Sequence, residues 1–359
     1  MLKLMTARCL SSARYPRVSI IVPCYNYGHF LLGCVDSLLS QRSVEVGILI
    51  IDDASPDGSG SVAEALAATD PRISVIRHKY NRGHIATYNE GLDHVDGDYT
   101  VLLSADDLLP HGALTRAVAL LEANASVGLA YGYPVNFSGS DLPPARHTVH
   151  SWSIWPGARW IRAQCRRGLS CIYSPEVVMR TSVQRDVGGF RHSLPHSADL
   201  ELWLRIAAVA DIGRVNGSDQ AYRRVHDASM MQSSYAGLLA DLEERRKAYE
   251  AFFAASGGAI RGGRGSLAIV RRRLAEEAIE GACHLLETGD AKTPSVAEYI
   301  SFARESYAHA TRLRPWKEYT LLLREGDCRQ AARLRRRGYA VRRHLEERLR
   351  FRRWQWTGV

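Results

Sequence analysis

The apolar residues in the first third of the chain follow two alternating patterns. Short apolar runs within 18–22, 46–55, 73–78 and 99–107 end in polar residues, which predicts buried strands. The segments 30–39, 61–69 and 84–95 between them have the spacing of helices. Strands that alternate with helices are typical of a mostly parallel, doubly wound sheet. We therefore expect an α/β fold with helices on both faces of the sheet.

The second half of the chain changes to a largely helical pattern. Strands are predicted at 175–180 and 218–230, helices at 181–188 and 196–210, and further helices from residue 235 onward. The pattern therefore indicates three regions. These are a loose leader at 1–16, an α/β domain at 17–232, and a helical region with a basic tail at 233–359.

Two of the predicted strands end in a pair of aspartates, Asp52-Asp53 and Asp106-Asp107. In open parallel sheets, ligands bind outside the carboxyl ends of the strands, so we expect Asp53 and Asp106 to face one crevice. Neighbouring carboxylates are costly to bury unless a positive group shares the site, which favours a bound cation. Each pair also has a purely structural interpretation, as a helix N-cap for Asp106-Asp107 and as an Asx-turn for Asp53.

The composition is that of an ordinary globular protein, with 46% apolar and 24% charged residues. No apolar run approaches the roughly 20 residues that span a bilayer. The seven cysteines are scattered and form no C-x-x-C pair, which argues against a zinc site or a disulfide framework. We therefore expect reduced thiols and a cytoplasmic location.

The formal net charge of +9 is concentrated at one end of the chain. Residues 329–359 contain eleven arginines and two glutamates, so this tail accounts for the whole excess. Such a tail can be a solvated helix face, a nucleic-acid-binding arm or an anchor to anionic lipid. Trp354 and Trp356 favour a peripheral contact with an anionic membrane, because tryptophan prefers the headgroup region. We expect no nucleic-acid partner.

Several segments, taken in order, resemble a known enzyme family. VSIIVPCYNYGHFLLGCVDSLLSQ, ILIIDDAS, NRG…YNEGL…DGDYTVLLSADD and GGFR…ADLELWLR…YRRVHDASM are similar to the family 2 glycosyltransferases, which have the GT-A fold. The resemblance covers roughly residues 17–232. It implies an inverting transfer of one sugar from a nucleotide-diphosphate sugar to a hydroxyl of a glycan or lipid-linked acceptor, with Mg²⁺ or Mn²⁺ as cofactor.

The resemblance also implies roles for individual residues. Asp106 and His226 match metal ligands, and Asp199 matches the catalytic base that accepts the proton of the acceptor hydroxyl. Contacts to the donor nucleotide and diphosphate are implied for Pro23, Tyr25, Asp53, Asn89, Ser104, Asp107 and Arg224. Tyr25 would stack on the base and Asp53 would accept a ring N–H, which favours UDP or dTDP.

The sequence departs from the family pattern at two positions. Ser104 stands where the first aspartate of the D-x-D element is usual, and Ala198 stands where an acid usually precedes the base. A catalytically degenerate nucleotide-sugar-binding module is therefore an alternative. A sugar-phosphate nucleotidyltransferase is a weaker one, because the loop after the first strand is not rich in glycine and basic residues. The cluster of Trp152, Trp155 and Trp160 has two interpretations, an acceptor platform or a cover for the sheet edge.

Overall fold

The computed structural model describes residues 2–9, 14–170, 172–226, 237–255, 263–288 and 294–325. The chain divides into two compact units, one formed by Met1–Ile161 with Ile172–Ser229 and the other by Arg162–Cys171 with Met230–Val359. The first unit contains the α/β region and the second contains the helical region. The arginine-rich tail at 329–359, with Trp354 and Trp356, lies outside the described residues.

A nine-stranded sheet, counted over the described residues, forms the first unit, in the order β1-β7-β9-β6-β8-β5-β2-β3-β4. Its strands are β1 (Lys3–Met5), β2 (Arg17–Cys24), β3 (Glu45–Asp52), β4 (Ile73–Arg77), β5 (Tyr99–Leu102), β6 (Val127–Phe137), β7 (Ser151–Trp155), β8 (Val178–Arg180) and β9 (Asp211–Arg224). The pairings of β5 with β2, β2 with β3 and β3 with β4 are all parallel. The four apolar runs of the first third therefore form the expected parallel block.

The other half of the sheet makes it mixed, whereas the sequence pattern predicted a mostly parallel sheet. β8 is inserted antiparallel between β5 and β6, and β7 is antiparallel to both β1 and β9. Among the described strands of this half, β6 and β9 alone pair in parallel. Two of the strands in this half, β6 and β7, come from the stretch between the fourth apolar run and residue 175, for which no strands were predicted.

The leader also differs from its prediction. It was expected to be loose, but Lys3–Met5 pairs antiparallel with β7, with Leu4 opposite Ser153. The side chain of Leu4 is 72% exposed, so this strand is held by backbone hydrogen bonds more than by apolar burial. Such a strand leaves no buried apolar run in the sequence, so the hydrophobic pattern does not predict it.

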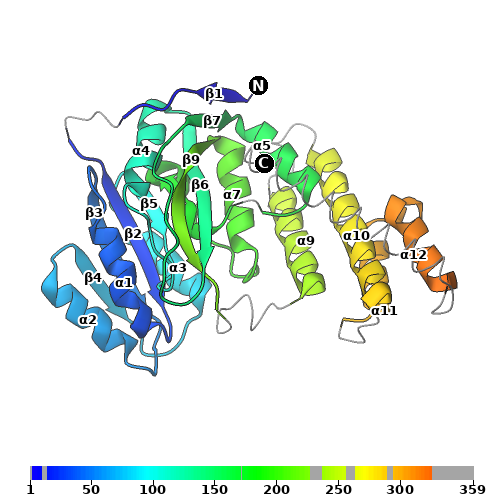
Figure 1. Ribbon diagram of the computed structural model, residues 1–359, viewed down its shortest axis with the longest axis horizontal. Helices are drawn as coiled ribbons and strands as arrows, with labels where there is room; N and C mark the ends of the chain where they lie inside the picture. Colours follow the sequence, from blue (N-terminus) through cyan, green and yellow to red (C-terminus); the bar gives the residue numbers. More distant parts are fainter. Residues whose placement is uncertain are drawn as a thin grey trace. The chain divides into compact units, whose positions relative to one another are not determined.

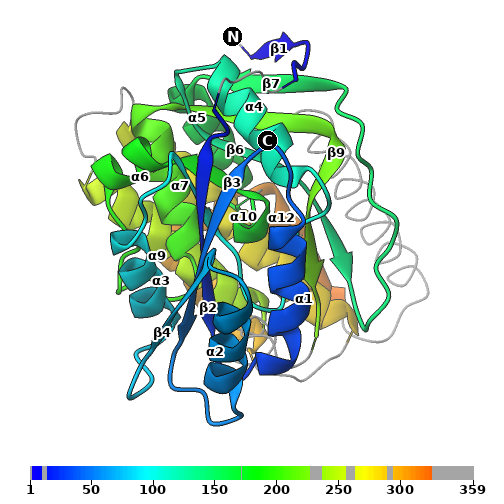
Figure 2. The same ribbon diagram turned by 90° about the vertical axis from the view of Figure 1, so that its left-hand side faces the viewer.

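Helices cover both faces of the sheet, as the alternation predicted. The helices of the first unit are α1 (Gly28–Leu39), α2 (Ser59–Thr69), α3 (His84–Asp93), α4 (Ala113–Ala123), the 3₁₀ turn η1 (Ser174–Glu176), α6 (Thr181–Val187) and α7 (Ala198–Val209). Helix α5 (Gly157–Arg167) begins in the first unit and continues into the second. Leu31 of α1, Ala63 of α2 and Leu114 of α4 share one core with alternate residues of β2. On the opposite face, α3 packs so closely on β2 that a Cβ at Gly91 would lie 2.4 Å from Ile21. Figure 1 and, from the side, Figure 2 show α1 and α2 on one face and α3 and α7 on the other.

The parallel strands end at one edge of the sheet. Cys24 of β2 lies opposite Asp52 of β3, and Asp52 lies opposite Arg77 of β4. The chain leaves two of these strands through left-handed residues, Asn26 at a φ of 60° and Ala54 at a φ of 59°. Left-handed backbone is costly for a residue with a β-carbon, and such positions gather at functional sites. The polar residues that follow these strands are thus collected along one edge.

The second unit is helical. It contains α9 (Leu238–Ala255), α10 (Gly263–Thr288), α11 (Val296–Ser306), the 3₁₀ turn η2 (Ala310–Arg312) and α12 (Arg314–Glu325). The buried Arg245 joins α9 to α10 through an ion pair with Glu277 at 3.0 Å. None of the helices in the described ranges combines the length and the apolar character needed to cross a membrane.

Candidate active site

Asp53 follows β3 and is enclosed by the segment that leads into α3. Its Oδ1 accepts the backbone N–H of Arg82 at 2.7 Å and lies 2.6 Å from Nδ1 of His78, and its Oδ2 accepts the N–H of Gly83 at 2.8 Å. Burial alone would raise the pKa of Asp53, but the hydrogen bonds from His78 and the two backbone groups outweigh it and lower the pKa. Asp53 is therefore a fixed, ionised acceptor with capacity left on Oδ2.

Asp106 and Asp107 lie in the turn after β5, both less than a tenth exposed. Oδ2 of Asp106 is 3.1 Å from Nε2 of His226, and Oδ1 of Asp106 is buried without a hydrogen-bond partner among the described residues. Oδ1 of Asp107 accepts the backbone N–H of Arg224 at 2.9 Å. Burial, followed by the charge of Asp106, raises the pKa of Asp107 well above its usual range. Further positive charge at this pair would therefore stabilise its ionised form.

The side chain of Arg224 is held between two aromatic rings beside this pair. Its guanidinium carbon lies 4.5 Å from the ring centre of Phe30 and 4.4 Å from that of Phe137. Nε of Arg224 donates to the backbone oxygen of Asp106 at 3.0 Å. These contacts fix a permanent cation next to the two carboxylates. An arginine that binds diphosphate would need such a fixed position, and this role stays a prediction for Arg224.

Helix α3 adjoins all of the predicted carboxylates. Its first turn follows the Arg82-Gly83 backbone that binds Asp53. Further along, the pKa of Tyr88 is raised by burial first, and then by the charges of Asp107, Asp106 and Asp199. Tyr88 is therefore within electrostatic range of all three carboxylates.

The same helix holds the segment that precedes Asp199. The Asn89 amide donates to the backbone oxygen of Phe190 at 2.9 Å, and its carbonyl accepts the N–H of Phe190 at 2.7 Å. Nε2 of His84 is 2.7 Å from the backbone oxygen of Pro195. Asp199 itself lies in the first turn of α7, where the helix dipole favours a negative charge. The two hydrogen bonds of Asn89 thus hold the segment around Phe190 in place. The contact of Asn89 with a nucleotide-sugar donor stays a prediction.

The remaining predicted donor residues lie at the same strand ends. Pro23 is half-buried in β2 opposite Ile51, and Ser104 accepts the backbone N–H of Asp107 through its carbonyl at 3.0 Å. The Tyr25 side chain is 45% exposed, which leaves its ring open to a stacking partner. Their contacts with a donor stay predictions.

Comparison with known proteins identifies the family. The model of glycosyl transferase family 2 matches residues 19–184. EpsJ of Bacillus subtilis, an uncharacterized glycosyltransferase, is 38% identical over 109 residues, which are 30% of this chain and 31% of EpsJ. Residues 19–184 of this chain belong to glycosyl transferase family 2. The matched segments cover only 31% to 60% of the lengths of the first curated relatives.

Two solved structures share the fold of this glycosyltransferase. TarS of S. aureus, in complex with UDP-GlcNAc, has a TM-score of 0.61 and 18% identity, with 89% of both chains covered. The mannosyltransferase PcManGT of Pyrobaculum calidifontis, in complex with GDP-Man and Mn²⁺, has a TM-score of 0.55 and 19% identity, covering 86% of this chain and 84% of its own. At these identities the likeness concerns the fold alone, and it confirms the expected GT-A architecture.

Two of the three clustered tryptophans of the glycosyltransferase pack in the core and are not available to a ligand. Trp152 on β7 and Trp160 on α5 are each 1% exposed. Neither ring is open to an acceptor sugar, so the platform interpretation is wrong for these two residues. Trp203 on α7 is fully buried as well.

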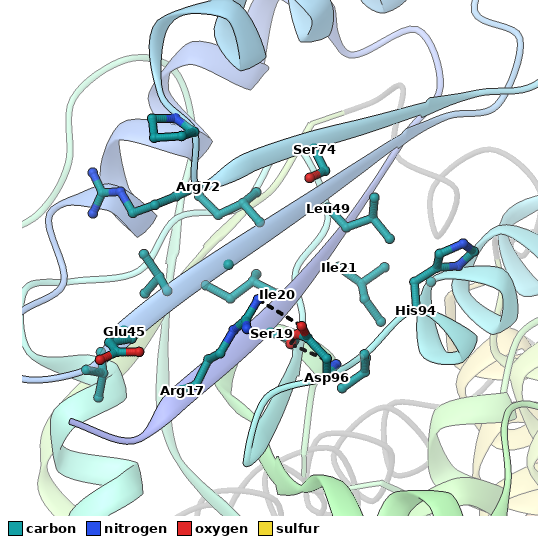
Figure 3. A pocket seen from close by; sticks show the side chains of 17 residues that line it. Arg17, Ser19, Ile20, Ile21, Glu45, Leu49, Arg72, Ser74, His94 and Asp96 are labelled. Carbon is teal, nitrogen blue, oxygen red and sulfur yellow. Dashed lines mark hydrogen bonds and ion pairs between the residues drawn. The ribbon is translucent and has the colours of Figure 1, made fainter. Parts of the chain in front are cut away.

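The glycosyltransferase also has a pocket of about 640 Å³ at the opposite end of the parallel strands. It is lined by residues from the amino-terminal halves of β2, β3 and β4 and from the end of α3. Figure 3 shows Asp96 of this pocket facing Arg17 and Ser19, at 2.9 and 3.2 Å respectively. The candidate active site lies at the carboxyl ends of these strands, so the pocket is separate from it.

Sequence reasoning missed three residues of the site. Burial, together with the charges of Asp106 and Asp107, raises the pKa of Tyr27 to about 12, and its ring lies 5.5 Å from that of His226. Tyr88 on α3 and His78 at the end of β4 complete the set. His78 had a readable signal, because it directly follows a third parallel strand, as Asp53 follows the second. Tyr88 had none, since a tyrosine in a helical pattern usually packs in the core.

Proposed function

We propose that this glycosyltransferase moves one sugar, with inversion, from a UDP-sugar or dTDP-sugar to a hydroxyl of a glycan or lipid-linked acceptor. The observation that carries the proposal is the buried pair Asp106-Asp107, with Arg224 held against it and one Asp106 oxygen lacking a partner among the described residues. A displacement at the anomeric carbon needs the base and the groups that hold the leaving diphosphate around one sugar. The pair and Arg224 would hold the diphosphate, and Asp199, whose charge also acts on Tyr88 of α3, would be the base.

The state of Asp53 supports the choice of nucleobase. An ionised carboxylate only accepts hydrogen bonds, so it favours a base with a ring N–H, which uracil, thymine and guanine have. Cytosine and adenine present a ring acceptor at the equivalent edge and would be repelled. TarS was solved with UDP-GlcNAc and PcManGT with GDP-Man, and both fit this rule. We take UDP and dTDP as leading donors and GDP, favoured by PcManGT, as the second candidate.

The residues after β5 fit a divalent cation such as Mg²⁺ or Mn²⁺. Oδ1 of Asp106 is a buried carboxylate oxygen that lacks a hydrogen-bond partner in the described chain, and Oδ2 faces His226. Carboxylate oxygen suits both ions, whereas an imidazole nitrogen ligand would favour Mn²⁺ over Mg²⁺, and PcManGT was solved with Mn²⁺. When bound, the cation would offset the charge of the leaving diphosphate. Ser104 offers a hydroxyl in place of a carboxylate, so we expect the protein alone to bind the cation weakly.

Asp199 would act as the base of the inverting step. It takes the proton of the acceptor hydroxyl while that oxygen attacks the anomeric carbon from the face opposite the diphosphate. The new carbon–oxygen bond forms as the bond to the diphosphate breaks, and Arg224 neutralises part of the charge that leaves. An acceptor linked to lipid at the inner membrane face would explain the basic tail.

Replacing Asp199 tests the proposal. We expect Asp199→Asn to lower turnover by about 10³-fold or more, because the amide cannot accept the proton, while donor binding stays within about twofold. The measurement pairs nucleotide release in the presence of acceptor with the Kd of UDP in Mn²⁺. Asp93→Asn, an exposed aspartate on α3, is the matched control. Near-normal turnover of Asp199→Asn would refute the assignment of the base.

The two rival functions give different results with the wild-type protein. A degenerate binding module would bind a nucleotide sugar yet release no nucleoside diphosphate with any acceptor. A nucleotidyltransferase would release pyrophosphate from a nucleoside triphosphate and a sugar phosphate. A thermal-shift screen of nucleotide sugars with and without Mn²⁺ comes first, since a ligand of the folded state raises stability with its affinity.

A further inference from the structure

His78 lies between two carboxylates at the edge of the site. Its Nδ1 is 2.6 Å from Oδ1 of Asp53, and its Nε2 is 2.9 Å from Oε2 of Glu90 on α3. The imidazole side chain is only 5% exposed, so water cannot replace either contact. Arg82, from the loop between β4 and α3, also binds Oε2 of Glu90.

This geometry requires a doubly protonated ring. A neutral imidazole has one N–H, and its other nitrogen offers a lone pair. Asp53 accepts two backbone N–H groups, and Glu90 accepts a hydrogen bond from the guanidinium of Arg82. Both carboxylates therefore only accept, and a neutral His78 would set a lone pair against one of them. The charged groups facing the ring are Asp53, Glu90 and Arg82. The charge of Asp53 also acts on the pKa of His84, at the start of α3.

The contact with His78 determines what Asp53 can offer a ligand. Oδ1 of Asp53 is occupied by His78 and the N–H of Arg82, whereas Oδ2 receives the N–H of Gly83 from the described chain. A carboxylate oxygen has two lone pairs, so one acceptor position remains, and it is on Oδ2. Loss of the His78 contact would free a second position on Oδ1 and would let the carboxylate turn.

We propose that His78, as an imidazolium, is a positioning residue for nucleobase recognition, which holds Asp53 with one acceptor position directed by the network toward a ring N–H. The proposal rests on the proposed function, because it needs Asp53 to contact the donor base. It differs from a merely structural link between β4 and α3 in what it demands. A structural link affects stability only, whereas a positioning residue affects which nucleobase binds and how tightly.

Three variants separate these possibilities. His78→Phe removes both hydrogen bonds, and His78→Gln keeps one donor for Asp53 without the charge. Glu90→Gln makes a neutral His78 acceptable, because the amide can donate to a ring nitrogen that carries a lone pair. His94→Gln is the matched control, since His94 is an exposed histidine at the end of α3 whose ring contacts the backbone oxygen of Glu90. Calorimetry at one fixed pH gives the Kd of UDP, dTDP, GDP and CDP in Mn²⁺ for each variant.

We expect His78→Phe to weaken UDP binding about tenfold or more, to narrow its preference over CDP, and to change kcat at saturating donor by less than about twofold. His78→Gln should recover part of the affinity. Glu90→Gln should keep the UDP affinity and the base preference of the wild type, because its amide can still pair with the ring and leaves the His78 contact with Asp53 in place. His94→Gln should match the wild type throughout.

Other outcomes overturn the proposal. Unchanged affinity and base preference in His78→Phe would show that His78 is not a positioning residue. If that variant fails to fold, wild-type affinity and base preference in His78→Gln lead to the same conclusion. A wild-type protein that binds UDP but transfers no sugar would refute the proposed function and leave the inference standing. A wild type that binds none of UDP, dTDP and GDP would end both.

Discussion

The buried carboxylate of Asp106 is the residue whose surroundings most need a ligand. We expect Asp106→Asn to weaken Mn²⁺-dependent UDP binding and to lower turnover by about 100-fold, because the amide removes the charge that faces the cation. His226→Gln should cost less, about tenfold, since it removes a neutral ligand or partner. Both effects should appear as a higher Mn²⁺ concentration for half-maximal activity.

The exposed Asp93 is again the control for this prediction, with the substitution Asp93→Asn. If Asp106→Asn keeps the wild-type response to Mn²⁺, the carboxylate pair has another role. Turnover that is equally high in a chelator and in Mn²⁺ would likewise count against a cation at Asp106.

At the residue scale, the sequence was informative where chemistry coincides with the end of a strand. The positions of Asp53 and Asp106 at one edge of the sheet could be predicted because each follows a strand of the parallel block, although an acid there can also serve as an Asx-turn or an N-cap. Asp107 and Arg224 lie beside Asp106, and their contacts with a donor stay predictions. Asn89 shows the limit, because its two hydrogen bonds go to the backbone of Phe190, 101 residues away. No spacing along the chain reports a partner at that distance.

At the element scale, α3 connects the surroundings of Asp53 to the segment that precedes Asp199, the proposed catalytic base. We expect Asn89→Ala to lower kcat about tenfold and to change the donor KM little, because it releases Phe190 and thereby the approach to Asp199. Asn89→Asp keeps the acceptor for the Phe190 N–H and should have a smaller effect. Steady-state kinetics at varied donor would distinguish a fall in kcat from a rise in KM.

A variant on the same helix provides the comparison. His94→Gln alters a contact to the Glu90 backbone and should leave both constants unchanged. A rise in KM alone for Asn89→Ala would instead support the donor contact that the family resemblance implies.

The strands that could not be predicted, β1, β6 and β7, do not leave a clear, uninterrupted apolar run in the sequence. β6 contains Pro134, which lacks an N–H, and its pairing with β9 shifts register around Tyr133 and Pro134. β8 pairs only with Leu129 and Ala130 of β6, so Pro134 lies on a locally open edge where the missing donor is tolerated. β7 and β1 are short and partly held by backbone contacts. Long, fully covered strands such as β2 and β3 leave a clear apolar run, and the pattern predicted both of them.

At the scale of the whole molecule, the net positive charge is confined to the tail at 329–359. The excess of +9 lies in residues 329–359, so the rest of the chain is close to neutral and has no net attraction to an anionic surface. Each basic residue near such a surface adds about 1 kcal/mol, and Trp354 and Trp356 would add interfacial contacts. If the acceptor is linked to lipid, the tail would keep the enzyme at the surface where the acceptor is.

This leads to a prediction for the full chain and vesicles. We expect the intact protein to float with vesicles that contain anionic lipid, and to stay behind with neutral vesicles. A chain lacking residues 329–359 should lose flotation yet keep its donor Kd, because the predicted donor residues all precede the tail. Salt should weaken binding, since the Debye length falls to about 3 Å at 1 M. Replacing Trp354 and Trp356 with alanine should lower flotation while the charge is unchanged. Equal flotation of the intact and shortened chains would remove the tail from any account of how the acceptor is reached.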